Sequence, residues 1–491
     1  MRRFFIVILM FCGTSTLLLA QQQNQRLIIL ADMGNEPDEE QQMVHMLMYA
    51  NEFDLEGLIA VTGKYLRKGT RPDLFFELID GYDRIVENLK KHDTGWPTPG
   101  YLKSIVVRGQ ERYGIAATGI GRTSPGSRLI VRALEKDDPR PIYIVINAGS
   151  NTLAQALIDY EATHSQEEFN RALNKIRVYE NGSQDNAGAW ICHQYPDIHW
   201  IRSNYQTYCY AGPSGDGGKD NKGNKRQLGP YTWEPYAYNG IGQHQWALEH
   251  IKGGHGPLGK GWPIRQFGNG GIIFMEGGGT IPWLGLVNKG LYDIEYPQWG
   301  GWSGRFSREK VENYWSKHAD IRVDEKNTTP FFVFKEEADS WIDPETGEEY
   351  KNHLFAPIWR WRRAFFNDFK GRMDWCVKDY GNANHNPLAV INGDKSDKII
   401  FIKAEAGKKL DLEASGSTDP DEDRLFYSWY YYKEAGTYLG NLVIHNADSM
   451  QASVIIPKDA KDKQLHVILE VRDNNKIVSM YDYRRLVIEV D

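Results

Sequence analysis

The chain has 491 residues, which is too long for one ordinary domain and predicts two or three. Its formal net charge is −7 and no basic tract follows the first few residues, so nucleic acid is not an expected partner. The 15 Trp and 27 Tyr leave two interpretations open: large aromatic cores, and contact with the apolar faces of sugar rings.

Residues 1–20 have the pattern of a secretory signal peptide. Arg2 and Arg3 precede a short apolar stretch, and Ala20 is followed by a run of Gln. Polar and small residues interrupt the stretch at 13–16, which argues against a membrane anchor, and no later segment is apolar enough to span a membrane. We therefore expect an exported protein, in the periplasm or at the cell surface.

From residue 26 onwards, short apolar runs alternate with stretches of helical periodicity. The predicted strands are 27–30, 58–61, 142–146, 176–179 and 198–201, and the predicted helices are 39–51, 152–157, 243–251 and 359–380. This alternation predicts an α/β domain over residues 26–384, with a mainly parallel sheet covered by helices on both faces. Ligands of such sheets bind at the carboxyl ends of the strands.

The composition changes near residue 384, and residues 387–491 predict an all-β, Ig-like sandwich. Its predicted strands are 399–402, 410–412, 426–431, 452–456, 465–471 and 485–490. The Asp-rich segment 416–423, followed by Trp429, resembles the cadherin-like class of Ig domains, with Trp429 in the core. The acidic segment is either a solvated turn or a structural calcium site, and the domain either binds glycan or braces the larger domain.

Three cysteines remain after the signal segment: Cys192, Cys209 and Cys376. An odd number does not form a disulfide framework, and no Cys/His spacing resembles a zinc site. A Cys192–Cys209 bridge and buried free thiols are both compatible with the sequence.

The first predicted strand runs directly into a cluster of carboxylates, from Asp32 to Glu40. Acidic residues in the first turn of a helix face the positive end of its dipole, which explains Asp38 to Glu40 but not Asp32. Carboxylates gathered at a strand end need a cation or raised pKa values. The segment is therefore either a metal or catalytic site, or a helix start that uses acidic residues.

The segment 32–39, Asp-Met-Gly-Asn-Glu-Pro-Asp-Glu, resembles the opening of the nucleoside hydrolases. It is more similar still to the nucleoside-hydrolase-like domain of secreted cellulose-binding proteins, which opens Asp-x-Gly-Asn-Glu-Pro-Asp-Asp. Further motifs of that branch are found at 51–60, 147–154, 275–277 and 300–305. The resemblance implies an exported hydrolase of glycosidic bonds, in which water attacks an anomeric carbon. Export and the aromatic content favour a glycan-derived saccharide over a nucleoside as substrate.

The resemblance also implies roles for the carboxylates at the strand end. Nucleoside hydrolases hold a calcium ion in their aspartate cluster, and one aspartate acts as general base on the attacking water. Carried over, the metal ligands are Asp32, Asp38 and Glu39, and the catalytic base is Asp38. Oxygen ligands suit calcium, and a bound cation lowers the pKa of water.

A second group of residues is expected to bind the substrate. Asn181 and Asp185 have the spacing of the family's Asn-x-x-x-Asp after a strand, with a polar turn as the alternative interpretation. Asn151 follows another strand, where helix capping is the alternative. The predicted substrate-binding residues are Asn35, Glu36, Asn151, Asn181, Asp185 and Glu276.

The sequence departs from the family pattern at the late aspartate that ligates calcium. The branch usually has Glu-Gly-Asp, whereas this chain has Gly278 at the third position. A non-catalytic carbohydrate-binding or cellulose-binding protein is therefore the alternative function, and an adhesin or scaffold comes third. No histidine is clearly placed to act as an acid on the leaving group; His193, His244 and His255 are candidates. The sequence does not predict an oligomeric state.

Overall fold

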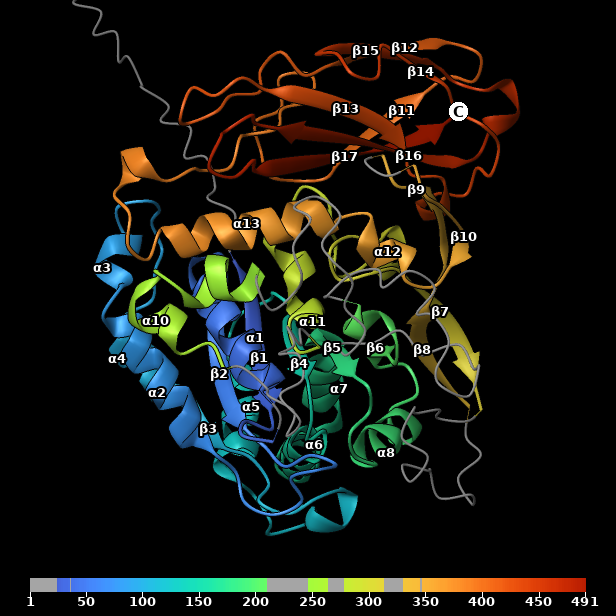
Figure 1. The fold of residues 1–491 in the computed structure, drawn as a ribbon. Coiled ribbons are helices and arrows are strands. Elements are labelled where there is room, and N and C mark those ends of the chain that lie inside the picture. The colour runs from blue at the N-terminus through green and yellow to red at the C-terminus, as the bar shows by residue number, and fades with distance from the viewer. Residues whose placement is uncertain (1–23, 36, 210–245, 264–277, 313–329, 345–346) are drawn as a thin grey trace, which may run out of the picture.

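The computed structural model describes residues 24–35, 37–209, 246–263, 278–312, 330–344 and 347–491. Figure 1 shows an α/β domain with an all-β domain lying over its helix α13. No helix in these ranges is long and apolar enough to cross a membrane.

An eight-stranded sheet with the order β3-β2-β1-β4-β5-β6-β8-β7 forms the centre of the first domain. Every neighbouring pair is parallel except β7 with β8. The prediction of a mainly parallel sheet is therefore confirmed. Its strands are β1 (Gln25–Ala31), β2 (Phe53–Ala60), β3 (Val106–Arg108), β4 (Ile142–Ile146), β5 (Ile176–Asn181), β6 (His199–Ser203), β7 (Phe306–Val311) and β8 (Phe331–Glu336).

Helices cover both faces of this sheet because its strands are apolar on both sides. In β1, Leu27 and Ile29 belong to one hydrophobic core, and Ile28 and Leu30 belong to the other. The helices α1, α2 and α13 pack in the first core, and α5, α6 and α8 in the second. The helices are α1 (Asp38–Leu47), α2 (Pro72–Asp83), α3 (Val86–Leu89), α4 (Pro99–Ser104), α5 (Pro125–Glu135), α6 (Asn151–Thr163), α7 (Gln166–Lys175), α8 (Ala187–Gln194), α10 (Gly256–Lys260), α11 (Ile281–Leu284), α12 (Ala356–Trp359) and α13 (Arg362–Asp374).

Two predicted helices differ from the structure. The predicted helix 359–380 is too long at both ends, because α13 spans Arg362–Asp374 and Trp359 is the last residue of the separate helix α12. Trp359, Trp361 and Phe365 are all buried in the core, as predicted, but they do not form one continuous stripe. The described part of the predicted helix 243–251 contains a π-helical turn, Leu248–Lys252.

The C-terminal domain is built only of sheets and short turns, as predicted. A four-stranded sheet with the order β11-β17-β16-β13 faces a three-stranded sheet with the order β12-β15-β14. Trp429 is 2% exposed and lies in the core between them, which confirms its predicted place. The strands are β11 (Ile400–Ala404), β12 (Lys409–Glu413), β13 (Phe426–Tyr431), β14 (Ile444–His445), β15 (Gln451–Ile455), β16 (Gln464–Arg472) and β17 (Tyr481–Val490).

The acidic segment of the C-terminal domain forms a hydrogen-bonded turn. The backbone N–H groups of Asp421 and Asp423 donate to Asp419 Oδ1 over 2.9 and 3.0 Å. Asp421 also accepts a hydrogen bond from the backbone N–H of His385 over 2.8 Å. The turn therefore attaches the C-terminal domain to the segment that connects it to α13.

A buried carboxylate, Asp339, joins the two domains at the small hairpin of β9 (Asp339–Ile342) and β10 (Glu349–His353). Its Oδ1 accepts from Arg305 Nε over 2.7 Å, and its Oδ2 accepts from Arg360 Nη1 over 3.0 Å. The hydroxyl of Tyr432, from the C-terminal domain, donates to the same Oδ2 over 2.6 Å. Asp339 and Tyr432 are completely buried, so this network is part of the interface core.

Arg485 of β17, in the C-terminal domain, makes a second set of contacts between the two domains. Its guanidinium is completely buried and donates to two backbone oxygens of the first domain, Leu291 O over 2.8 Å and Gly300 O over 2.9 Å. The carbonyl groups of these loops are thus satisfied by a side chain from the other domain.

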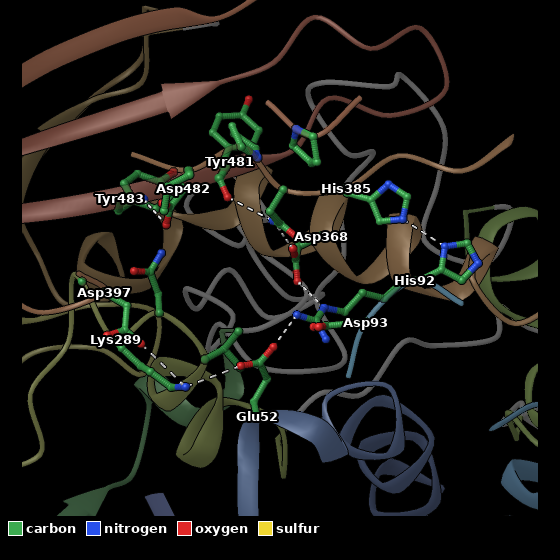
Figure 2. Close-up of a pocket in the computed structure, with 18 of the residues that line it drawn as sticks. Glu52, His92, Asp93, Lys289, Asp368, His385, Asp397, Tyr481, Asp482 and Tyr483 are labelled. Carbon is green, nitrogen blue, oxygen red and sulfur yellow. Dashed lines mark hydrogen bonds and ion pairs between the residues drawn. The ribbon is translucent and has the colours of Figure 1, made fainter. Parts of the chain in front are cut away.

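A cavity of about 380 Å³ lies between the domains, at the amino-terminal edge of the large sheet, and Figure 2 shows charged residues that line it. Its charges are paired with one another: Arg372 donates to Glu52 over 2.8 Å, and Lys289 Nζ lies 3.8 Å from Glu52 and 3.9 Å from Asp397. Glu52 directly precedes β2, so this cavity lies at the edge opposite the carboxyl ends of the strands.

The three cysteines in the described residues are buried and free. Burial raises the pKa of the Cys192 and Cys209 thiols well above its usual value. Of the two interpretations left open by the sequence, buried thiols are the one observed.

Candidate functional site

The polar residues predicted from the sequence follow neighbouring strands of the large sheet. Leu30 of β1 pairs with Ile146 of β4, and Ile146 pairs with Glu180 of β5. Parallel strands are about 4.8 Å apart. The residues just beyond these pairs, among them Asp32 and Asn181, therefore meet at one edge of the sheet.

Three carboxylates gather where β1 leads into α1. Asp32 is 1% exposed and Glu39 is 2% exposed, while Asp38 in the first turn of α1 is half-buried. Burial raises the pKa of Glu39 well above its usual value, and the negative charges of Asp38 and Asp32 raise it further. The predicted metal ligands Asp32, Asp38 and Glu39 therefore lie close enough to interact.

Asn147, directly after β4, holds one oxygen of Glu39. Its Nδ2 donates to Glu39 Oε2 over 2.9 Å and approaches Gln42 Oε1 of α1 at 3.4 Å. Neither Glu39 Oε1 nor Asn147 Oδ1 has a hydrogen-bond partner among the described residues, although both atoms are buried. Buried acceptors of this kind require a hydrogen-bond donor or a cation. These two oxygens can therefore accept a hydrogen bond from a ligand or bind a cation.

Two glycines allow the chain to approach these side chains closely. A Cβ on Gly63, after β2, would lie 2.1 Å from Asp32 Oδ2. A Cβ on Gly279 would lie 2.6 Å from Asn147 Nδ2. The preceding Gly278 accepts a hydrogen bond from Thr207 Oγ1 over 2.7 Å. The segment with the departure from the family pattern therefore lies beside the carboxylates, and Gly278 contributes no side chain there.

Asp185 connects the loop after β5 to the start of α6. It is completely buried and accepts hydrogen bonds from Ser150 Oγ, from the backbone N–H of Asn151 over 3.2 Å and from that of Ala187 over 2.8 Å. Burial raises its pKa, and these hydrogen bonds oppose the rise. In this structure its oxygens are used to position Asn151 and the loop.

Asn151 and Asn181, which follow or end neighbouring strands, each carry a buried amide oxygen. Asn151 Nδ2 donates to Arg112 O over 2.8 Å. Within the described part of the chain, Asn151 Oδ1 and Asn181 Oδ1 have no hydrogen-bond partner. Together with Glu39 and Asn147 they make a set of buried oxygens suited to sugar hydroxyl groups or to a hard cation.

The remaining predicted residues are less informative. Asn35 Nδ2 lies 3.4 Å from Asp32 Oδ2. Glu36, Glu276 and His244 lie outside the described residues. His255 pairs with Asp374 at 3.3 Å, next to α13 in the core on one face of the sheet. Over the described ranges, no three His, Cys, Asp or Glu residues are arranged to hold a metal by themselves.

Neither Asn147 nor Gln42 is among the residues predicted from the sequence. Asn147 has the same signal that identifies Asp32, a polar residue directly after a buried apolar strand. Gln42 lies four residues after Asp38 in α1, about one helical turn further along. Only its contact with Asn147 identifies it as part of the site.

Two family profiles match the chain. "Cellulose-binding Sde182, nucleoside hydrolase-like domain" matches residues 26–306, and "Cellulose-binding protein Sde0182, C-terminal domain" matches residues 409–490. A solved structure from Saccharophagus degradans is 35% identical, covers 95% of this chain and 100% of its own, and has a TM-score of 0.78. It is described as a nucleoside hydrolase-related hypothetical protein that is associated with carbohydrate metabolism.

Other structural matches are weak. An endo-fucoidan hydrolase of glycoside hydrolase family 107 is 10% identical, covers 95% of this chain and 82% of its own, and has a TM-score of 0.16. An endo-beta-1,4-mannanase from Thermotoga petrophila is 11% identical, covers 96% and 98%, and has a TM-score of 0.19. Neither value indicates a shared fold. Among curated proteins, no match is found.

Proposed function

Because the chain belongs to the family of cellulose-binding proteins with a nucleoside hydrolase-like domain, we propose that it is an exported hydrolase of glycosidic bonds in glycan-derived saccharides. The observation that carries the proposal is the pair of unsatisfied buried oxygens, Glu39 Oε1 and Asn147 Oδ1, next to Asp32 and Asp38. The signal-like residues 1–20 support export.

In the proposed reaction, Asp38 takes a proton from the water that attacks the anomeric carbon. Its place in the first turn of α1 keeps it half-buried and partly open to solvent, as a base on water requires. Asp32 and Glu39 stabilise the positive charge that develops on the sugar ring. The amide oxygens of Asn181 and Asn151 accept hydrogen bonds from sugar hydroxyl groups and orient the ring.

The donor chemistry of the site fits calcium. Asp32, Asp38 and Glu39 supply carboxylate oxygens, and the unsatisfied Asn147 Oδ1 supplies a neutral one, which is an all-oxygen set. The acidic groups alone do not complete a metal site in the described residues, so neutral oxygens are needed. A bound calcium ion would lower the pKa of water and neutralise the carboxylate cluster.

Calcium is expected to raise the melting temperature of the mature protein by about 3 °C when present at about 100 times its Kd, and EDTA to reverse the rise. Asp38→Asn removes one ligand charge and should reduce the rise at the same calcium concentration. Thermal unfolding of both proteins in calcium and in EDTA makes the measurement. An equal rise in both proteins would place the ion elsewhere, and no rise in either would remove calcium from the proposal.

A second function is favoured by one observation: Gly278 lies beside the site without the usual carboxylate. The alternative is therefore a carbohydrate-binding protein without catalysis. A panel of nucleosides and oligosaccharides, incubated with and without calcium, tests the hydrolase by product analysis. Retention on insoluble glycan without any turnover of the panel would favour the binding protein and contradict the hydrolase.

A further inference from the structure

A groove of about 590 Å³ lies where the four-stranded sheet of the C-terminal domain meets α13 and β9. Figure 1 shows this sheet over α13, with β9 at its edge. The groove lies between the two domains and shares no residue with the strand-end site. Its volume is within the range of about 300–1,000 Å³ that is typical of small-ligand sites.

Strand pairing brings two rows of side chains across the sheet into this groove. Ser428 of β13 pairs with Glu470 of β16, which pairs with Tyr483 of β17. Phe426 pairs with Arg472, which pairs with Tyr481. Paired residues of neighbouring strands point to the same face. Each row thus combines an aromatic ring with a charged group, and all six residues line the groove.

Aromatic rings on both sides of the groove are held in place by a neighbouring ring or guanidinium group. Trp341 of β9 stacks on Tyr350 with ring centroids 5.7 Å apart and an interplanar angle of 11°. Phe426 is 37% exposed, and the Arg472 guanidinium lies 5.0 Å from its ring centroid. Large rings that are held in place and partly exposed present flat apolar faces, to which the C–H face of a sugar ring is complementary.

The groove is also cationic. Arg360, Arg363 and Arg472 line it against the single carboxylate of Glu470. Arg360 is paired with Asp339, but Arg472 makes no ion pair within 4.0 Å in the described part of the molecule. Burial raises the pKa of Glu470, whereas a hydrogen bond with Tyr483 and the charges of Arg472 and Arg363 oppose the rise. Glu470 attracts Arg472 without a close ion pair, so the Arg472 guanidinium keeps donors that can bind an anionic group of a ligand in bidentate fashion.

We propose that this groove binds an acidic oligosaccharide, a chain of sugar rings that carry carboxylate or sulfate groups. The rings stack on Phe426 and Trp341, and an anionic substituent pairs with Arg472. Ser428 and Glu470 hydrogen-bond to ring hydroxyl groups. The site is distinct from the strand-end site, so it would hold an acidic glycan on the protein whether or not the first domain hydrolyses one.

Isothermal titration of the full mature chain tests this with three probes: an oligogalacturonate, a sulfated galactan oligosaccharide and a neutral cello-oligosaccharide. We expect one of the acidic probes to bind with a Kd on the order of 10–500 μM and the neutral probe to bind at least about tenfold more weakly. The acidic probe that binds identifies the substituent. Equal binding of the neutral probe, or no binding of either acidic probe, would overturn the proposal.

Two matched pairs of variants locate the binding. Phe426→Ala and Arg472→Gln should each weaken the acidic probe at least about tenfold. Phe76→Ala, whose ring on α2 is 36% exposed, and Arg171→Gln, whose side chain on α7 is 59% exposed, lie outside the groove and should leave Kd unchanged. Unchanged Kd in both groove variants would exclude the groove. Asp38→Asn should bind normally, which separates this site from the proposed hydrolysis.

Discussion

Asp38→Asn is expected to lower kcat for saccharide hydrolysis by at least about 100-fold, because an amide cannot take the proton from the attacking water. Asp38 is half-buried, and the substitution keeps its size, so the melting temperature in EDTA should stay close to that of the wild type. The measurement is the initial rate on the best substrate of the oligosaccharide panel, with KM determined separately. A variant with more than a tenth of the wild-type kcat would remove Asp38 from the role of base.

Gly63→Ala provides a second perturbation of the same site without a change of charge. Its new Cβ would lie 2.1 Å from Asp32 Oδ2, so the Asp32 carboxylate must move. Activity should fall in this variant also, whereas Gly100→Ala, whose new Cβ would meet no atom outside the local backbone within 4 Å, should be fully active. Loss of activity in both glycine variants would indicate a general effect on the fold.

Asp339→Ala is expected to lower the free energy of unfolding by about 3–5 kcal/mol, because it leaves buried charges without their partner. Arg305 and Arg360 both depend on this carboxylate, at 2.7 and 3.0 Å. Both guanidinium groups are at most 9% exposed, so water cannot replace the lost contact. Urea denaturation followed by tryptophan fluorescence measures the change.

Tyr432→Phe is the matched control for the same hydrogen-bond network between the domains. It removes one hydrogen bond to Asp339 but leaves the ring and both ion pairs, so a loss of about 1 kcal/mol is expected. If Asp339→Ala cost no more than Tyr432→Phe, the two arginines would not depend on Asp339 for stability. Two separate unfolding transitions in Asp339→Ala would show that the Asp339 network couples the unfolding of the two domains.

The parallel sheet could be predicted because its inner strands are continuous apolar runs. The predicted strand 142–146 of this sheet has the observed boundaries, and so does the strand 426–431 of the C-terminal domain. The edge strand β7 was not predicted, since its buried Phe306 is followed by alternating exposed and half-buried residues, among them Arg308 and Lys310. Such a pattern does not differ from a polar loop in the sequence.

The carboxylate cluster could be predicted because its members are close together in sequence. The contact of Asn147 with Glu39 joins residues 108 positions apart, and no local pattern indicates it. Asp339 is similar, because its two arginine partners and Tyr432 come from three separate segments. The groove depends on strand register across β13, β16 and β17, which the sequence does not specify.

Arg485 has a consequence for the order in which the chain matures. The backbone oxygens of Leu291 and Gly300 are satisfied by the side chain of Arg485, which lies in β17. During synthesis these two oxygens therefore lack their contacts with Arg485 until β17 has been made. Strand β17 thus completes the hydrogen bonding of loops that are made almost two hundred residues earlier.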